Sequence, residues 1–319
     1  MDEVSSDPGR TWHYRDFYRP AGTPAAEDLP LWLVVGNCQA EALRQVLDAV
    51  PNRPYRTARI PPVHELTAAD LPHLRRLLSE TAVLVSQPIR DDYRDLPIGT
   101  AQLGAALQPG ATTVRWPVIR FSGLYPFQVI VRHPADRSVT PPVVPYHDLR
   151  TLVAARDGLD VDDLWDVEVP PAAIRAVAQA SVAELARRER RDTDVGVSDV
   201  LARHGADAAH TINHPGNPVL RDLAARILAV RDVDAVVPDP PRVLLSSVYA
   251  PLETRVLSAL GVEAPAREQW TVQGQPVSPQ QVHITQLFWY RENPDYITLA
   301  EQRHHVVLDL LGLNPAGVS

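Results

Sequence analysis

The chain has 319 residues, of which 45% are hydrophobic and 22% charged, a composition typical of a globular protein with one large domain or two smaller ones. Its net charge of -8 argues against a nucleic-acid-binding protein, because such a protein needs a basic face. A single cysteine excludes an internal disulfide framework and a multi-thiolate zinc site, and no metal is expected. No apolar run is long enough to span a membrane and no signal-peptide pattern is present, so a soluble cytoplasmic protein is predicted.

The first part of the chain is predicted to form an arm followed by a strand, a turn and a helix. Residues 1–29 are polar, proline-rich and aperiodic, which predicts an irregular N-terminal arm. The apolar run Leu31–Val35 predicts a strand buried on both faces, and it stops at Gly36. Residues 40–50 then carry apolar side chains at helical spacing and end at a proline, which predicts a helix.

Strands and helices continue to alternate along the next part of the chain. The predicted elements are a helix capped by Thr67, a buried strand, a short helix and a third strand, over residues 67–78, 82–86, 99–107 and 116–121. Parallel strands joined by helices form a common type of sheet. The alternation therefore predicts an α/β fold with an open parallel sheet flanked by helices.

After about residue 145 the chain is predicted to be mostly helical. Amphipathic spacing indicates helices over residues 170–190, 197–204, 218–230, 252–260, 278–290 and 294–311. We therefore expect an α/β region over 30–145 that carries the nucleophile, and a mainly helical region over 146–319 packed on it. Because no linker marks the boundary, a single domain over 30–319 is the alternative.

Cys38 is the first candidate for a chemical role, because it lies at the predicted turn between the first strand and its helix. Free backbone N–H groups and the helix dipole at such a turn favour a thiolate with a depressed pKa. The same N–H groups, from Gly36 to Gln39, can form an oxyanion hole. The alternative is a small buried hydrophobic residue, which a lone cysteine usually is.

Two histidines are candidates for a general base. His210 and His214 belong to a segment that ends in His-Pro-Gly-Asn-Pro, which predicts a loop leading into a helix. Asp207, three residues before His210, could orient an imidazole, and either histidine could activate Cys38. The alternative is a loop whose histidines make only backbone hydrogen bonds. A zinc site is disfavoured, because the spacing lacks an intervening glutamate and a second thiolate.

Residues 121–126 form a further candidate segment. They follow the third predicted strand at the edge of the sheet where ligands collect, so we expect them to line a pocket. The alternative is an aromatic-rich turn.

Four short blocks together carry a family resemblance. They are Val-Val-Gly-Asn-Cys-Gln at 34–39, Ser-Gln at 86–87, Phe-Ser-Gly-Leu-Tyr-Pro at 121–126 and His-Thr-Ile-Asn-His-Pro at 210–215. In this order they resemble the WcbI-like polysaccharide biosynthesis family, acetyltransferases that bind coenzyme A, over residues 31–312. Gly-Asn-Cys-Gln after a strand is the most specific of the four blocks. The resemblance implies an SGNH-like (GDSL) architecture with a cysteine in place of the nucleophilic serine.

The resemblance also implies roles for individual residues. Cys38 matches the nucleophile, and Gln87 is expected to project toward the same edge of the sheet. His214 matches the family's strongest histidine, with His210 just before it. Phe127 departs from the pattern, because an acidic residue is expected there. The expected oxyanion and substrate-binding residues are Gly36, Asn37, Gln39, Gln87, Ser122, Gly123 and Asn213.

These observations predict a coenzyme A-dependent acyltransferase, with acetyl as the expected acyl group. Cys38 would take the acyl group from acyl-CoA and pass it to a hydroxyl or amine acceptor, a saccharide among the candidates. Arginines would hold the phosphates of coenzyme A, because the chain has no lysine. One alternative is a cysteine-dependent esterase or thioesterase on the same scaffold. The other is a non-catalytic binding protein in which Cys38 is buried and protonated.

Overall fold

The computed structural model describes residues 8–20, 22–23 and 27–314, which form two compact units. The first unit combines the chain up to Val118 with Leu185–Leu201 and Gly216–Leu245. The second unit combines Ile119–Glu184, Ala202–Pro215 and the chain from Ser246 onward. This division differs from the expected boundary at residue 145, because the chain returns twice to the first unit after leaving it.

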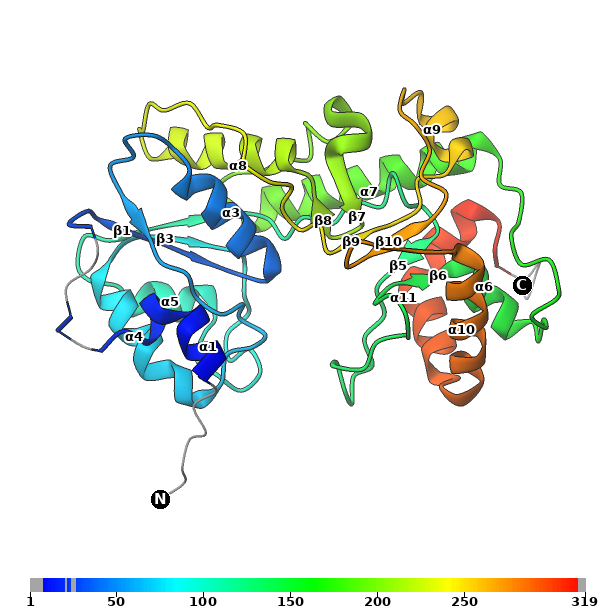
Figure 1. The fold of residues 1–319 in the computed structure, drawn as a ribbon, viewed down its shortest axis with the longest axis horizontal. Helices are drawn as coiled ribbons and strands as arrows, with labels where there is room; N and C mark the ends of the chain where they lie inside the picture. The colour runs from blue at the N-terminus through cyan, green and yellow to red at the C-terminus, as the bar shows by residue number, and fades with distance from the viewer. Residues whose placement is uncertain (1–7, 21, 24–26, 315–319) are drawn as a thin grey trace, which may run out of the picture. The chain divides into compact units, whose positions relative to one another are not determined.

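A four-stranded parallel sheet forms the centre of the first unit, in the order β2-β1-β3-β4 (Figure 1). Its strands are β1 (Leu31–Val35), β2 (Arg56–Thr57), β3 (Thr81–Ser86) and β4 (Thr112–Arg115). All residues of β1 are buried, as expected for a strand covered on both faces. Val35 lies opposite Ser86 in the β1–β3 ladder. The next residues of the two strands, Gly36 and Gln87, therefore reach the same carboxyl edge of the sheet.

Helices cover both faces of this sheet, with α3 and α8 on one face and α4 and α5 on the other (Figure 1). Their bounds are α3 (Cys38–Asp48), α4 (Leu71–Glu80), α5 (Thr100–Ala105) and α8 (Asn217–Val230). Leu31, Leu33 and Val35 share one hydrophobic cluster with leucines of α4 and α5. On the opposite face, Trp32 stacks on Tyr55 with ring centroids 4.1 Å apart. The predicted α/β fold with a parallel sheet flanked by helices is confirmed.

The N-terminal arm is partly helical, which corrects the expectation of an irregular segment over 1–29. Its described part contains α1 (Pro8–His13) and α2 (Arg15–Tyr18), whereas residues 1–7 lie outside the described residues. Phe17 is fully buried in the hydrophobic cluster of the first unit. Arg10 also donates to the carboxylate of Asp70 at 3.2 Å. A buried ring and several ion pairs, of Arg10 and Arg19 among others, therefore hold a segment whose composition shows no helical periodicity.

The strand predicted over 116–121 is wrong. The strand of this region, β4, ends at Arg115, and the residues after it have no regular structure. Pro117 cannot donate a ladder hydrogen bond, which stops the pairing. Trp116 is fully buried and donates its indole N–H to the carbonyl oxygen of Val85 at 3.2 Å. The apolar run is thus a core segment without a strand.

The α-helix predicted over 197–204 is also wrong. This region forms turns followed by a 3₁₀ helix, η2 (Ala202–Ala208), which is kinked at Gly205 with φ of 50°. The carboxylate of Glu189 accepts hydrogen bonds from the backbone N–H groups of Val197 and Ser198. These two residues are therefore held by a side chain of the preceding helix, and a regular helix does not form.

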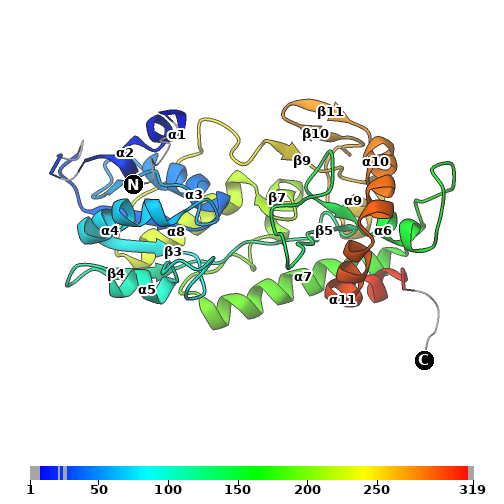
Figure 2. The same cartoon turned by 90° about the horizontal axis from the view of Figure 1, so that it is seen from below.

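The second unit is mainly helical, as predicted for much of this part of the chain. Its helices are α6 (Leu149–Arg156), α9 (Thr254–Leu260), α10 (Pro279–Glu292) and α11 (Asp295–Leu311), and α7 (Pro171–Asp192) contributes residues to both units. Both α10 and α11 pack against α6 (Figure 2). Except for α6, these helices were predicted to within a few residues.

Short strands of the second unit were not predicted. They are β5 (Gln128–Val129) with β6 (His147–Asp148), β7 (Ala209–Thr211) with β8 (His214–Pro215), and β9 (Val248–Tyr249) with β10 (Trp270–Val272) and β11 (Gln275–Val277). Runs of two or three residues carry too little periodicity to be recognised. Among the described residues, no helix has both the length and the apolar character needed to cross a membrane.

Candidate active site

Cys38 is the first residue of α3, directly after the turn that follows β1. Asn37 caps this helix, because its side-chain oxygen accepts the backbone N–H of Gln39 at 2.9 Å. Cys38 is a free thiol and is partly exposed. The predicted strand, turn and helix are therefore confirmed, and they place the sulfur at the helix N-terminus.

Gln87 reaches across from the end of β3 to the same turn, as predicted. Its side-chain oxygen accepts the backbone N–H of Asn37 at 2.9 Å, and its side-chain nitrogen donates to the oxygen of Gln39 at 3.1 Å. Both glutamines are buried, Gln87 with 2% of its surface exposed. This buried polar chain therefore holds the backbone of Asn37 before Cys38 and the side chain of Gln39 after it.

Gly36 is required by this arrangement. A Cβ atom at this position would lie 2.5 Å from the side-chain oxygen of Gln87 and 2.8 Å from its Cδ. The absence of a side chain therefore lets Gln87 approach the turn closely enough to bond Asn37.

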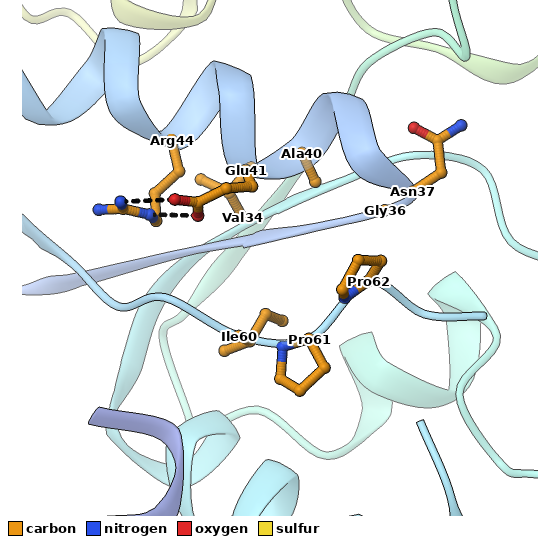
Figure 3. Close-up of a pocket in the computed structure, with 9 residues that line it drawn as sticks. All are labelled: Val34, Gly36, Asn37, Ala40, Glu41, Arg44, Ile60, Pro61 and Pro62. Atoms are coloured by element: carbon orange, nitrogen blue, oxygen red, sulfur yellow. Dashed lines mark hydrogen bonds and ion pairs between the residues drawn. The ribbon is translucent and has the colours of Figure 1, made fainter. Parts of the chain in front are cut away.

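A narrow cleft runs along the start of α3 (Figure 3). On one side lie Gly36, Asn37 and the ion pair of Glu41 with Arg44, and on the other lie Pro61 and Pro62. The cleft holds about 10 Å³, the space of one water molecule. It is therefore too small to hold an arm of coenzyme A.

The pKa of the Cys38 thiol is raised, which is opposite to the expected depressed pKa. Burial is the largest cause, because it disfavours the charged thiolate. The backbone N–H groups of Cys38 and Gln39 act in the other direction and lower the pKa by hydrogen bonding to the sulfur. The free protein therefore holds Cys38 mostly as a thiol at neutral pH.

Alkylation of Cys38 by iodoacetamide is expected to become about tenfold faster per pH unit from pH 6 to 8.5, because the folded pKa lies above the ordinary value of about 8.5. The chain has one cysteine, so total labelling followed by mass spectrometry reports on this thiol alone. A rate that levels off below pH 8 would contradict a raised pKa. Since folding favours the protonated thiol, stability is also expected to fall as the pH rises above about 8.5.

In the second unit, His210 and His214 lie on the β7–β8 hairpin, where Thr211 pairs with His214. The imidazole of His210 packs at 4.7 Å from the ring of Tyr249. Asn213, in the turn of the hairpin, accepts the hydroxyl of Tyr146 at 2.8 Å. The predicted loop is thus a short hairpin with defined side-chain contacts.

The segment over 121–126 packs against this hairpin. Phe121 donates its backbone N–H to the carbonyl oxygen of Ile212 at 2.8 Å. The hydroxyl of Tyr125 donates to the carbonyl oxygen of Ala209 at 2.7 Å. The backbone N–H of Ser122 donates to the hydroxyl of Ser181 at 2.9 Å. A Cβ atom at Gly123 would collide with the ring of Phe121. These two sequence blocks are therefore brought together within the second unit.

Asp207 does not take the expected position. Its side chain is exposed in η2 and makes no hydrogen bond or ion pair with His210 or His214 among the described residues. Cys38 belongs to the first unit and both histidines to the second. The pairing of Cys38 with either histidine stays a prediction.

Phe127 stands where the family resemblance suggests an acidic residue. Its ring lies under two guanidinium groups, with Arg150 4.1 Å and Arg255 4.8 Å from the ring centroid. Arg150 is already paired with Asp148 and two further carboxylates. The ring of Phe127 therefore contacts these guanidinium groups through cation–π interactions, where the family pattern has an acidic side chain. No sequence pattern pointed to this cluster.

Among the residues that the structure describes, no group of three histidine, cysteine, aspartate or glutamate side chains is arranged to hold a metal ion.

The fold and the buried glutamines around Cys38 define an α/β protein whose candidate nucleophile lies at a strand–turn–helix edge. The family described as polysaccharide biosynthesis enzyme WcbI matches residues 31–235, so the chain belongs to the WcbI family. Membership in this family identifies it as an enzyme of polysaccharide biosynthesis. No curated protein matches the chain.

A solved structure of WcbI is similar in fold, with a TM-score of 0.73 and 17% sequence identity. The match covers 90% of this chain and 99% of WcbI. That structure is described as native protein without a disulfide bond between coenzyme A and a cysteine of WcbI.

Proposed function

We propose that this protein is a coenzyme A-dependent acyltransferase in which Cys38 is the nucleophile. The observation that carries the proposal is the placement of Cys38 at the N-terminus of α3, in a turn that the buried side chain of Gln87 anchors. Family membership supports an enzyme of polysaccharide biosynthesis. The description of the WcbI structure, which names coenzyme A together with a cysteine although no disulfide joins them there, supports a site where coenzyme A lies near a cysteine.

In the first step, the Cys38 sulfur attacks the thioester carbon of acyl-CoA and forms a new C–S bond. The backbone N–H of Cys38 at the start of α3 would hold the negative charge that develops on the carbonyl oxygen, which is the role of an oxyanion hole. The N–H groups of Asn37 and Gln39 already donate to the side chains of Gln87 and Asn37. His214 or His210 would take the proton from the thiol and deliver it to the sulfur of departing coenzyme A. A raised thiol pKa makes such a base necessary, because little thiolate is present beforehand.

In the second step, a hydroxyl or amine of the acceptor attacks the acyl-cysteine. Its proton passes through the histidine to the Cys38 sulfur, which leaves as a thiol. Acetyl is the expected acyl group, and a saccharide hydroxyl fits the family's role in polysaccharide biosynthesis. Because the cleft beside α3 is too small, the thioester would approach Cys38 from its exposed side.

Intact-mass measurement after brief incubation with acetyl-CoA tests the proposal. The wild-type protein is expected to gain the mass of one acetyl group, and Cys38→Ser is expected to gain none in the same time. His214→Gln or His210→Gln is expected to slow acetylation at least about 100-fold, whereas the exposed His305→Gln keeps the wild-type rate.

The same experiment separates the competing functions. An acetyl-cysteine that persists in buffer and is discharged by an acceptor supports the transferase. Rapid discharge to acetate in buffer alone supports a thioesterase, and no acetylation of wild-type protein overturns nucleophilic catalysis by Cys38.

A further inference from the structure

The second unit contains a cavity of about 290 Å³ that neither Cys38 nor the two histidines line. Its volume is close to the lower limit of about 300 Å³ for small-molecule sites in proteins. The wall combines aromatic rings with charged groups, and the rings belong to Tyr146, Trp165 and Trp270. Small-molecule sites commonly have this mixture of apolar rings and a few polar groups.

The charged groups of this cavity do not favour an anionic ligand. Four carboxylates and two guanidinium groups line it, an excess of two negative charges, from Asp148, Asp166, Glu253, Glu268, Arg150 and Arg267. Arg150 has 7% of its side chain exposed and is paired with Asp148 at 2.6 Å and Asp166 at 2.7 Å. Arg267 donates to the carbonyl oxygen of Ala250 at 2.7 Å. A phosphate or carboxylate would therefore meet repulsion and occupied cations.

Two buried polar atoms on the lining residues have no hydrogen-bond partner within the described part of the chain. They are Nε2 of His283, which is 1% exposed, and the side-chain oxygen of Gln128, which is 7% exposed. Buried polar atoms of this kind are usually bonded. The other ring nitrogen of His283 lies 2.9 Å from the hydroxyl of Thr151, and the ring stacks on Trp165 at 4.3 Å. The imidazole is thus held in a fixed orientation.

Hydroxyl groups match the polar atoms of this lining. A hydroxyl can donate to Glu268 and to the oxygen of Gln128. It can also bond Nε2 of His283 in either tautomer, because it both donates and accepts. The aromatic rings can pack against the C–H face of a carbon skeleton.

We propose that this cavity binds a hydroxyl-rich ligand without negative charge, of the size of a single sugar ring. The excess of negative charge disfavours the phosphates of coenzyme A, so coenzyme A is not the ligand expected in this cavity.

Saturation-transfer NMR on the full chain tests binding directly, without any acyl transfer. The probes are N-acetylglucosamine, glucosamine, glucuronate and adenosine 3′,5′-bisphosphate, the nucleotide part of coenzyme A. Saturation transfer is expected to the first two sugars and to be absent or much weaker for glucuronate. The bisphosphate is expected not to displace either sugar.

Two exposed glutamates of one segment provide a matched pair of variants. Glu268 lines the cavity and Glu263 does not. Glu268→Arg is expected to weaken sugar binding about tenfold or more, and Glu263→Arg to leave it unchanged. Trp165→Ala is expected to weaken binding as well, and a thermal melt checks that each variant is folded.

The proposal is overturned if no saturation transfer to either sugar is seen, or if saturation transfer to glucuronate is equally strong. It is also overturned if sugar binding is unchanged in both Glu268→Arg and Trp165→Ala. The result is independent of the acetylation experiment. Sugar binding without formation of acetyl-Cys38 supports the cavity as a sugar site and overturns the proposed acyltransferase mechanism. Formation of acetyl-Cys38 without sugar binding supports that mechanism and overturns the cavity as a sugar site.

Discussion

Replacing Arg150 with methionine is expected to lower the free energy of unfolding by about 3 kcal/mol. The guanidinium is buried and paired with Asp148 at 2.6 Å, Asp166 at 2.7 Å and Glu253 at 3.0 Å. Methionine fills much of the same volume but leaves these carboxylates without their shared cation. The cost is at the lower end for a broken buried ion pair, because Arg255 still contacts Asp166 and Glu253. Urea denaturation followed by circular dichroism measures the loss.

Arg291→Met is the matched control, because Arg291 pairs with Asp160 at the surface, with side chains 48% and 74% exposed. Its loss is expected to cost less than about 1 kcal/mol. Equal losses of unfolding free energy in Arg150→Met and Arg291→Met would contradict the expectation that the buried ion-pair cluster stabilises the fold more than a surface ion pair.

The effect of Arg150→Met is expected to depend on pH. Partial burial raises the pKa of Asp166, but the Arg150 and Arg255 guanidinium groups outweigh it and hold this pKa below its ordinary value. This carboxylate therefore stabilises the fold above about pH 4, and the contribution is lost as the pH falls through the folded pKa. The difference between wild type and variant should shrink at acidic pH, which denaturation at pH 7 and pH 3 measures.

The strand–turn–helix around Cys38 was predictable because its signals are local. Five consecutive buried apolar residues make β1, and an asparagine before the cysteine caps α3. The approach of Gln87 was also predictable, since neighbouring parallel strands end at one edge of the sheet. The family resemblance also pointed to Cys38 and Gln87, so it agreed with the local sequence pattern at both positions.

The cavity of the second unit could not be predicted in the same way. Thr151 and His283, which fix its imidazole, are 132 positions apart in the chain. Trp165 lies in a segment without helical or strand periodicity, and its role depends on stacking against His283. Residues that meet only through tertiary packing leave no periodic or short-range signal. The raised pKa of Cys38 was not predicted either, because it depends on how deeply the folded chain buries the thiol.

Gly36→Ala is expected to destabilise the protein by about 2–4 kcal/mol and to slow acetylation of Cys38 about 100-fold. The backbone of Gly36 does not have a positive φ, so the conformation itself accepts alanine. The cost comes from the new Cβ, which would lie 2.5 Å from the side-chain oxygen of Gln87. Gln87 would have to withdraw from Asn37 and Gln39, and the backbone beside Cys38 would lose its anchor. Urea denaturation and the acetylation rate measure the two effects.

A double-mutant cycle isolates this cause. In a Gln87→Ala background the three atoms nearest the new Cβ, all in the Gln87 side chain, are absent, so Gly36→Ala should cost less than about 1 kcal/mol there. Gly104→Ala in α5 is the control, because the nearest atom to its Cβ, the hydroxyl oxygen of Thr113, lies at an ordinary 3.6 Å and alanine favours a helix. An equal penalty for Gly36→Ala in both backgrounds would show that Gln87 is not what requires glycine at this turn.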